Sequence, residues 1–177
     1  MSSFSKQSKV VLRVFLDSDD EELKSEYAKH VKNHNERIEN NPYPDSGFDL
    51  LVPKDYVILD ESINSVFLDL QLKTEMVVQH SDGIQEPAAY FLFARSSFSK
   101  TPLMLSNHTG IIDAGYRGNL KVALRNLGKK AYAIEKYTRP VQICHPTLQK
   151  IHVIIVEKES DLSSTVRGDG GFGSTGK

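Results

Sequence analysis

Hydrophobic and polar positions alternate along most of the chain in short runs, and such runs predict β-strands. Two of them are SVFLDLQL (65–72) and NLKVALRN (119–126). Seven further runs, rich in β-branched and aromatic residues, are KVVLRVFL (9–16) and the segments at 48–53, 74–80, 88–94, 131–137, 140–146 and 151–158. Many short strands separated by turn signals are typical of a closed barrel or a jelly roll of two packed sheets. The pattern therefore predicts a mainly β protein.

One segment near the N-terminus has the periodicity of a helix instead. Its apolar and aromatic side chains recur every three or four residues: Leu23, Tyr27, Val31, His34 and Ile38. Ser18 and Glu21 have the spacing of a capping box, which predicts that the helix begins just after Ser18. The remaining positions are mostly charged, so we expect a surface helix that ends at the two prolines of NNPYPDSG.

The composition is that of an ordinary globular domain. The chain has 177 residues, of which 39% are hydrophobic and 25% charged, and its formal net charge is −1. That balance gives no basic field for nucleic acid, and no apolar run reaches the length of about 18 residues expected of a membrane span. The first residues lack the apolar core of a signal peptide. We therefore expect a soluble intracellular protein, cytoplasmic or nuclear, that binds neither nucleic acid nor membranes.

Two features that could suggest a metal or a nucleophile have simpler interpretations. His30 and His34 lie one helical turn apart, but the sequence suggests no third ligand, so we expect a solvent-facing or half-buried pair rather than a zinc site. Cys144 is the only cysteine, which excludes an internal disulfide. It lies in an apolar run, and we expect an inert thiol in the core.

The segment NHTGIIDAGYRGNL (107–120) carries the clearest chemistry. Two apolar stretches flank Asp113, and glycines stand at 110, 115 and 118. This composition predicts a tight hairpin that exposes backbone N–H and C=O groups. A carboxylate near its tip is ionised at neutral pH and can orient a water molecule as a general base. From this segment alone, a turn-forming aspartate and a catalytic base are equally open interpretations.

A second polar segment follows the apolar run at 88–94. In ARSSFSKTPL (94–103), Arg95 stands next to Ser96 and Ser97. A guanidinium beside hydroxyl groups at the end of a strand suits the oxygens of a phosphate, since charge-assisted hydrogen bonds are among the stronger ones. Taken alone, an ordinary polar loop explains this segment more simply.

Five segments, taken in chain order, resemble the five motifs of the trimeric dUTPases, the dUTP diphosphatases. They are SGFDLLVP (46–53), ARSSFSKTPL (94–103), NHTGIIDAGYRGNLKVALRN (107–126), RPVQI (139–143) and RGDGGFGSTG (167–176). The resemblance runs from about residue 46 to the end of the sequence, and its third and fifth motifs are long and specific. The helix and linker at 18–45 fall outside it and resemble an insertion after the first strand.

The resemblance implies a fold, an activity and an assembly. The fold would be a distorted β jelly roll, with a β domain over 1–165 that includes the insertion, and an arm over 166–177 that closes over the active site. The activity would be Mg²⁺-dependent hydrolysis of dUTP to dUMP and pyrophosphate, which keeps uracil out of DNA and supplies dUMP for dTMP synthesis. The assembly would be a homotrimer whose three active sites are each shared between chains.

By position, the resemblance also implies roles for particular residues. Asp113 would activate the water that attacks the α-phosphorus, and Gln142 would help hold phosphate and water. Tyr116 would pack under the deoxyribose and leave no room for a 2′-hydroxyl, while Phe172 would cover the uracil. The residues implied to bind substrate are Arg95, Ser96, Ser97, Asn107, Gly110, Ile112, Tyr116, Arg167, Phe172, Gly173, Ser174 and Thr175. Mg²⁺ would be held mainly by the phosphates and waters, with Asp49 in support.

Two other functions stay open. The dCTP deaminases share the fold, and Gly115, where dUTPases usually have an acidic residue, resembles them. They carry a catalytic glutamate in the following strand, however, where this chain has Ala123. The chain could instead be a nucleotide-sensing or partner-binding module on the same fold, with the 18–45 insertion as its docking surface. The fourth motif departs from the family pattern on both sides of Arg139, which leaves the role of that residue undetermined.

Overall fold

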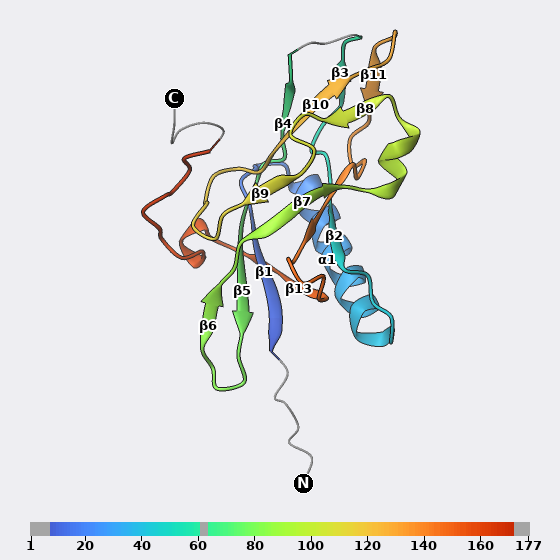
Figure 1. Ribbon diagram of the computed structural model, residues 1–177. Helices are drawn as coiled ribbons and strands as arrows, with labels where there is room; N and C mark the ends of the chain where they lie inside the picture. The colour runs from blue at the N-terminus through green and yellow to red at the C-terminus, as the bar shows by residue number, and fades with distance from the viewer. Residues whose placement is uncertain (1–7, 61–63, 172–177) are drawn as a thin grey trace.

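The computed structural model describes residues 8–60 and 64–171, and within them thirteen short strands and one α-helix make up a mainly β fold (Figure 1). The strands are β1 (Lys9–Leu16), β2 (Gly47–Leu50), β3 (Tyr56–Ile58), β4 (Val66–Asp69), β5 (Leu72–Gln79), β6 (Gln85–Pro87), β7 (Tyr90–Ala94), β8 (Leu103–Leu105), β9 (Gly110–Ile112), β10 (Lys121–Asn126), β11 (Tyr132–Ile134), β12 (Val141–Cys144) and β13 (Ile151–Val156). The helix α1 spans Glu21–Asn40, and two 3-10 turns, η1 and η2, span Ser96–Lys100 and Glu159–Asp161. No helix in the described ranges is long and apolar enough to cross a membrane.

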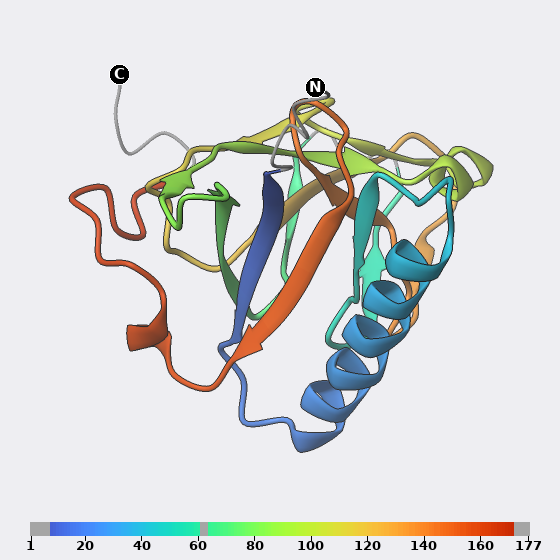
Figure 2. The same cartoon turned by 90° about the horizontal axis from the view of Figure 1, so that it is seen from below.

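The strands form four sheets that share one core. β13, β1, β5 and β6 lie in that order in one sheet, and β2, β12, β7 and β9 form a second; β4, β10 and β8 make a third, and β11 pairs with β3. β1 and β13, from opposite ends of the chain, run parallel and lie side by side (Figures 1 and 2). Buried side chains from all four sheets and from α1 line a single hydrophobic cluster. The mainly β class predicted from the sequence is confirmed.

The helix α1 packs beside β13, on the side away from β1 (Figure 2). All five residues predicted for its apolar face are buried. Polar side chains on the same face also bind the strand: the His34 ring nitrogen Nε2 lies 2.9 Å from the Ile151 carbonyl oxygen. The Asn35 amide donates to the Val153 carbonyl at 2.8 Å and accepts the Val153 N–H at 3.0 Å. The helix is therefore attached to the sheet by hydrogen bonds as well as by apolar contact.

The predicted N-cap of this helix is wrong. Asp20 is the N-cap, and its carboxylate accepts hydrogen bonds from the backbone N–H groups of Glu22 and Leu23 at 3.0 and 3.1 Å. Ser18 lies outside the helix, where its hydroxyl accepts the Asp20 N–H and donates to the Gln71 side chain. Serine and aspartate cap helices about equally well. Which of the two becomes the N-cap therefore depends on the path of the chain between the end of β1 and the start of α1.

The simpler interpretations of the histidines and the cysteine agree with the structure, with one difference. His30 and His34 bind backbone carbonyls at 2.9 Å, but His34 is only 2% exposed rather than half-buried. Burial lowers the pKa of both imidazoles, which therefore stay neutral at pH 7. Cys144 is buried. Its burial raises the pKa of the thiol, and the negative charge of Asp49 adds a smaller effect in the same direction. It is a core residue with little thiolate character.

Replacing Leu23 by alanine should lower the free energy of unfolding by about 2–5 kcal/mol, because it removes a fully buried leucine from the core. Urea unfolding measures this change. The control is Lys32→Ala, on the exposed face of the same helix, which should change stability by no more than about 0.5 kcal/mol. Equally small effects for both variants would mean that α1 adds nothing to the core.

Candidate active site

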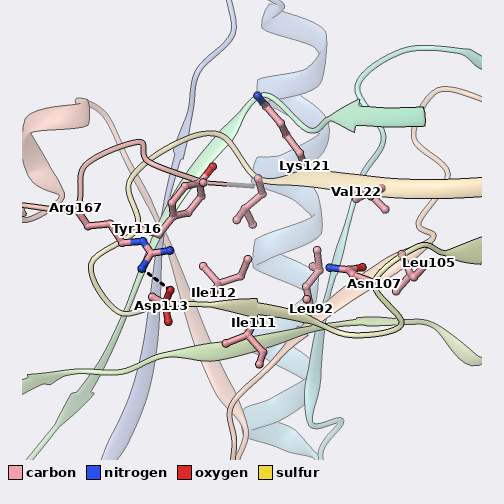
Figure 3. Close-up of a pocket in the computed structure, with 14 residues that line it drawn as sticks. Leu92, Leu105, Asn107, Ile111, Ile112, Asp113, Tyr116, Lys121, Val122 and Arg167 are labelled. Carbon is pink, nitrogen blue, oxygen red and sulfur yellow. Dashed lines mark ion pairs between the residues drawn. The ribbon is translucent and has the colours of Figure 1, made fainter. Parts of the chain in front are cut away.

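A cavity of about 210 Å³ lies between β7, the segment that joins β9 to β10, and the C-terminal segment (Figure 3). The predicted pairing of the two strands flanking Asp113 is wrong, because β9 pairs with β7 whereas β10 pairs with β4 and β8. We use the name hairpin for the bend over 107–120 that connects them. β9 pairs with β7, so that Gly110 stands opposite Leu92. A Cβ at position 110 would lie 3.0 Å from the Leu92 Cβ, which is why this close approach of two strands uses glycine. The side chains of Leu92, Leu105 and Val122 give the cavity apolar walls, and the Asn107 amide lies at the end away from Asp113 (Figure 3).

Asp113 supplies the cavity with a carboxylate held by an arginine from the C-terminal segment. Its Oδ2 lies 2.8 Å from Nη1 of Arg167 (Figure 3). The two side chains are 48% and 40% exposed, so both are accessible to a ligand in the cavity. A carboxylate at the mouth of a small pocket, held in place by a guanidinium, has the geometry of a group that orients a water molecule.

Tyr116 lies across the base of the hairpin. Its hydroxyl donates to the Asn119 carbonyl at 2.9 Å, and its ring covers Gly118 and Gly171. A Cβ at position 118 would lie 2.7 Å from the Tyr116 hydroxyl oxygen, so a larger residue there would displace the ring. Burial has the largest effect on the pKa of the Tyr116 phenol and raises it, and the nearby carboxylates of Asp69 and Asp169 raise it further. The ring therefore forms a neutral, rigid floor of the site.

A buried ionic cluster lies behind the hairpin. Arg117 donates from Nη1 to the carbonyls of Ala114 and Tyr116, at 2.9 and 2.8 Å, and from Nη2 to Glu75 at 2.8 Å. Its Nε donates to the Ser163 carbonyl at 2.9 Å. Glu75, only 2% exposed, also binds Arg13 at 2.7 Å and the Ser163 hydroxyl. Arg117 thus fixes both the hairpin and the start of the C-terminal segment to the sheet.

A second group of charged side chains gathers where β2, the end of β7 and the start of β12 meet. The Asp49 carboxylate binds Arg95 Nε at 2.7 Å and Arg139 Nη1 at 3.4 Å. Arg95 also donates to the Arg139 carbonyl at 3.1 Å. One carboxylate thus orients two guanidinium groups, and guanidinium groups are well suited to phosphate oxygens. We call Asp49, Arg95 and Arg139 the arginine cluster.

The remaining residues of the second and fourth motifs adjoin the arginine cluster. Ser96 and Ser97 begin η1 immediately after Arg95. Gln142 pairs with Asp49 across β12 and β2, and a side chain at Gly47 would overlap its amide. These residues are therefore neighbours of the arginine cluster, and their role at a phosphate site stays a prediction.

Within one chain the expected site residues form two separate groups. The hairpin cavity collects Asn107, Gly110, Ile112, Asp113, Tyr116 and Arg167. The second group consists of Asp49 and Arg95 of the arginine cluster with the adjoining Ser96, Ser97 and Gln142, none of which is among the described residues lining that cavity. Phe172, Gly173, Ser174 and Thr175 lie outside the described residues.

Comparison with known proteins identifies the family. The family model described as dUTPase matches residues 34–176, which is most of the chain. The chain belongs to the dUTPase family. The match begins within α1, so residues 21–33, the larger part of that helix, lie before it.

Individual relatives agree with this membership. The deoxyuridine 5′-triphosphate nucleotidohydrolase of Rickettsia felis is 47% identical over 77 residues, which cover 44% of this chain and 50% of the relative. The enzyme of the same name from Escherichia phage T5 is 33% identical over 103 residues, or 57% of this chain and 68% of the relative. The chain thus spans about half the length of the rickettsial relatives that it matches.

A solved dUTPase structure shares the fold. The Staphylococcus bacteriophage 80alpha dUTPase, a G164S mutant with dUpNHpp, superposes with a TM-score of 0.51 at 22% identity and covers 94% of this chain and 99% of that one. The expected jelly-roll-like fold of the dUTPase family is confirmed.

Sequence reasoning missed part of this dUTPase-family site. The buried cluster of Arg117, Glu75 and Arg13 joins three distant segments, and no local pattern marks it. Lys121 also lines the cavity, although it points away from Asp113 (Figure 3). Its place two residues before Ala123, which the resemblance already put in the site, was the available signal, because residues two apart in a strand lie on the same face of the sheet.

The donors in the chain fit a Mg²⁺ ion that arrives with its substrate. Among the described residues, no three His, Cys, Asp or Glu side chains are grouped closely enough to hold a metal. Mg²⁺ commonly keeps several waters and binds through substrate phosphates with one or two carboxylates. Asp49, the carboxylate of the arginine cluster, would be the supporting carboxylate for such an ion.

Proposed function

We propose that this chain hydrolyses dUTP to dUMP and pyrophosphate, and so keeps uracil out of DNA and supplies dUMP for dTMP synthesis. The observation that carries the proposal is Asp113, which is the only carboxylate among the described residues that line the hairpin cavity. Ala123, in the wall of the same cavity, stands where a deaminase would carry its glutamate, which argues against deamination. Because dUTP is an intracellular nucleotide, we expect the chain to act in the cytoplasm or nucleus.

In this mechanism Asp113 acts as the general base. Its carboxylate takes a proton from a water molecule whose oxygen attacks the α-phosphorus, while the bond between that phosphorus and the oxygen bridging to the β-phosphorus breaks. Pyrophosphate leaves and dUMP remains. Arg167, 2.8 Å from Asp113, holds the carboxylate in place and contributes positive charge next to the reacting phosphate.

The hairpin would select the base and Tyr116 the sugar. Asn107 and residues 110–112 line the cavity, and their backbone groups, with the Asn107 amide, would pair with the uracil edge. Cytosine would leave fixed backbone groups unpaired, and the methyl of thymine would clash with the narrow hairpin, because a fixed steric barrier excludes a methyl better than added binding favours it.

Tyr116→Ala should admit UTP. The variant removes the ring that would pack under the deoxyribose, so kcat/KM for UTP should rise relative to dUTP by about tenfold or more. Steady-state kinetics with both nucleotides measures the ratio. Tyr116→Phe keeps the ring and should keep the discrimination. An unchanged ratio in Tyr116→Ala would remove Tyr116 from this role.

The phosphates would bind the arginine cluster and the C-terminal arm. Arg95, Ser96, Ser97 and Gln142 would bind the α- and β-phosphates, and Mg²⁺ bound to the triphosphate would supply neutralisation of its negative charge. We propose that residues 166–177 close over the nucleotide, with Phe172 on the uracil and Arg167, Gly173, Ser174 and Thr175 at the phosphates. A glycine-rich arm can order on binding and open for release.

We propose that the chain works as a homotrimer, in which the hairpin cavity of one chain meets the arginine cluster of a neighbour. This accounts for the separation of the two groups within one chain. Asp113→Asn and Arg95→Ala, each inactive alone, should therefore complement each other in mixed trimers. In a trimer containing both variants, one site of the three combines an intact hairpin with an intact cluster, so about one third of the wild-type activity should return.

The complementation experiment uses chains with two different affinity tags, co-expressed and purified through both. Trimers of two Asp113→Asn chains, tagged differently, are the control and should stay inactive. No recovery in the mixed trimers would mean that the two groups act within one chain.

Hydrolysis in H₂¹⁸O tests the proposed chemistry. Attack at the α-phosphorus should place the label in dUMP, and mass spectrometry of both products reads it. Label found in pyrophosphate would mean attack at the β-phosphorus and would overturn the role proposed for Asp113.

A further inference from the structure

The helix α1 covers the open edge of β2, the strand that carries Asp49. β2 is an edge strand, because its sheet runs in the order β2, β12, β7 and β9. Side chains of α1 bind the backbone of Asp49, in β2, and of Leu51, the residue that follows the end of β2. The Tyr27 hydroxyl accepts the Leu51 N–H at 3.0 Å and lies 3.3 Å from the Leu51 carbonyl, to which it donates. The His30 ring nitrogen Nε2 lies 2.9 Å from the Asp49 carbonyl.

The protonation state of His30 follows from its partner. A carbonyl oxygen only accepts hydrogen bonds, so Nε2 of His30 carries the proton. The ring stacks on Phe48, with centroids 4.9 Å apart and an angle of 28° between planes. Burial, with a smaller effect from the charge of Arg139, keeps the imidazole neutral by lowering its pKa. His30 is thus a fixed donor to one backbone oxygen of β2.

Asp49 binds α1 through its backbone carbonyl, and it binds Arg95 and Arg139 through its carboxylate. The Asp49 carboxylate is 16% exposed and holds Arg95 at 2.7 Å and Arg139 at 3.4 Å. A movement of β2 would carry this carboxylate, and with it both guanidinium groups. Edge strands have one side without ladder hydrogen bonds, and here Tyr27 and His30 supply hydrogen bonds on that side.

We propose that α1 is a positioning element for triphosphate binding, in which Tyr27 and His30 fix β2 so that Asp49 presents Arg95 and Arg139 to the α- and β-phosphates of the nucleotide. This inference rests on the proposed function and adds a role for the insertion. Tyr27 and His30 are positioning residues, since they act through β2 and Asp49. The inference predicts that their loss weakens recognition of the triphosphate and spares recognition of the nucleoside.

His34 offers a matched control within the same helix. It is one turn from His30, is also neutral, and its ring also contacts Phe48, with centroids 5.0 Å apart. Its Nε2, however, binds the Ile151 carbonyl of β13 rather than β2. His30→Leu and His34→Leu therefore remove comparable rings and hydrogen bonds, and only the first removes a bond to the strand of Asp49.

The experiment measures binding of dUMP and of a non-hydrolysable dUTP analogue to the full-length chain by calorimetry. His30→Leu should lower the affinity for the triphosphate analogue relative to dUMP by about three- to tenfold, the size of one lost hydrogen bond. Tyr27→Phe, which removes only the hydroxyl, should shift the ratio in the same direction. His30→Gln, whose amide can donate to the carbonyl, should restore it. His34→Leu should leave the ratio at the wild-type value, even if it lowers the midpoint temperature of unfolding.

Two results would overturn the proposal. An unchanged ratio of affinities in both His30→Leu and Tyr27→Phe would show that α1 does not act on the arginine cluster. An equal shift in His34→Leu would show a general effect of helix stability. Hydrolysis of dUTP by the wild-type chain tests the proposed function separately, so either idea can fail while the other stands.

Discussion

Asp113→Asn should lower kcat for dUTP by about a hundred- to ten-thousandfold, the range that general-base catalysis contributes. Asparagine keeps the size of the side chain and can still bind Arg167 with its amide oxygen, but it cannot take a proton from water. The affinity for a non-hydrolysable dUTP analogue should stay within about tenfold of the wild-type value, because the base acts mainly in the chemical step. Stopped-flow or steady-state release of pyrophosphate gives kcat, and calorimetry gives the affinity.

The control for this variant is Asp19→Asn, which removes one exposed carboxylate that does not line the cavity. It should leave both kcat and affinity unchanged. Wild-type turnover in Asp113→Asn would exclude Asp113 as the base, and a fall in affinity as large as the fall in kcat would mean that the residue mainly binds substrate.

Arg117→Ala should destabilise the protein by about 3–5 kcal/mol, the cost of breaking a buried ion pair by removing one partner. Glu75, 2% exposed, would keep Arg13 but lose its bond to Arg117, and the carbonyls of Ala114 and Tyr116 would lose their donor. Turnover of dUTP should also fall, since the hairpin and Ser163 are no longer held together. Urea unfolding monitored by circular dichroism measures the stability. Arg125→Ala, on an exposed position of β10, should change it by no more than about 0.5 kcal/mol.

The same variant should be less sensitive to acid. Burial alone would raise the pKa of Glu75, but hydrogen bonds from Ser163 and Arg13 and the charge of Arg117 outweigh it and lower the pKa below its ordinary value. A carboxyl with a lowered pKa in the folded state stabilises the protein above its unfolded pKa of about 4.3, and this stabilisation is lost as the pH falls through the folded pKa. The difference in stability between wild type and Arg117→Ala should therefore be larger at pH 7 than at pH 3. A difference that does not depend on pH would contradict this account of Glu75.

The sequence predicted the fold class because several core strands are long enough to show either alternation or a run of β-branched and aromatic residues. β1 matches its predicted range, and the apolar face of α1 is buried as expected. Strands β3, β6 and β8 have three residues each, too few to display a period of two. The helix start differed because adjacent serine and aspartate side chains are both good caps, and the path of the chain out of β1 decides between them.

The sequence named most residues of the candidate site, but it did not predict how they are held in place. The hairpin residues are neighbours in sequence, so Asp113, Gly110 and Tyr116 fall into one cavity as expected. Arg117 belongs to the third motif, at 107–126. Its partners Glu75 and Ser163 lie far away in the chain, so they can be found only from the tertiary structure. The contact between α1 and Asp49 was likewise invisible, because a hydrogen bond from a helix side chain to a strand backbone leaves no pattern in the strand.

Hydrolysis of dUTP by this chain is tested by measuring pyrophosphate release in the presence of Mg²⁺, beside dCTP, dTTP and UTP, with ammonia followed in parallel. We expect rapid release from dUTP and little from the other three, because the hairpin, Tyr116 and Asp113 act together in one site. Ammonia from dCTP would place the chain with the deaminases instead. Tight binding of dUTP without any product would contradict catalysis and leave a nucleotide sensor.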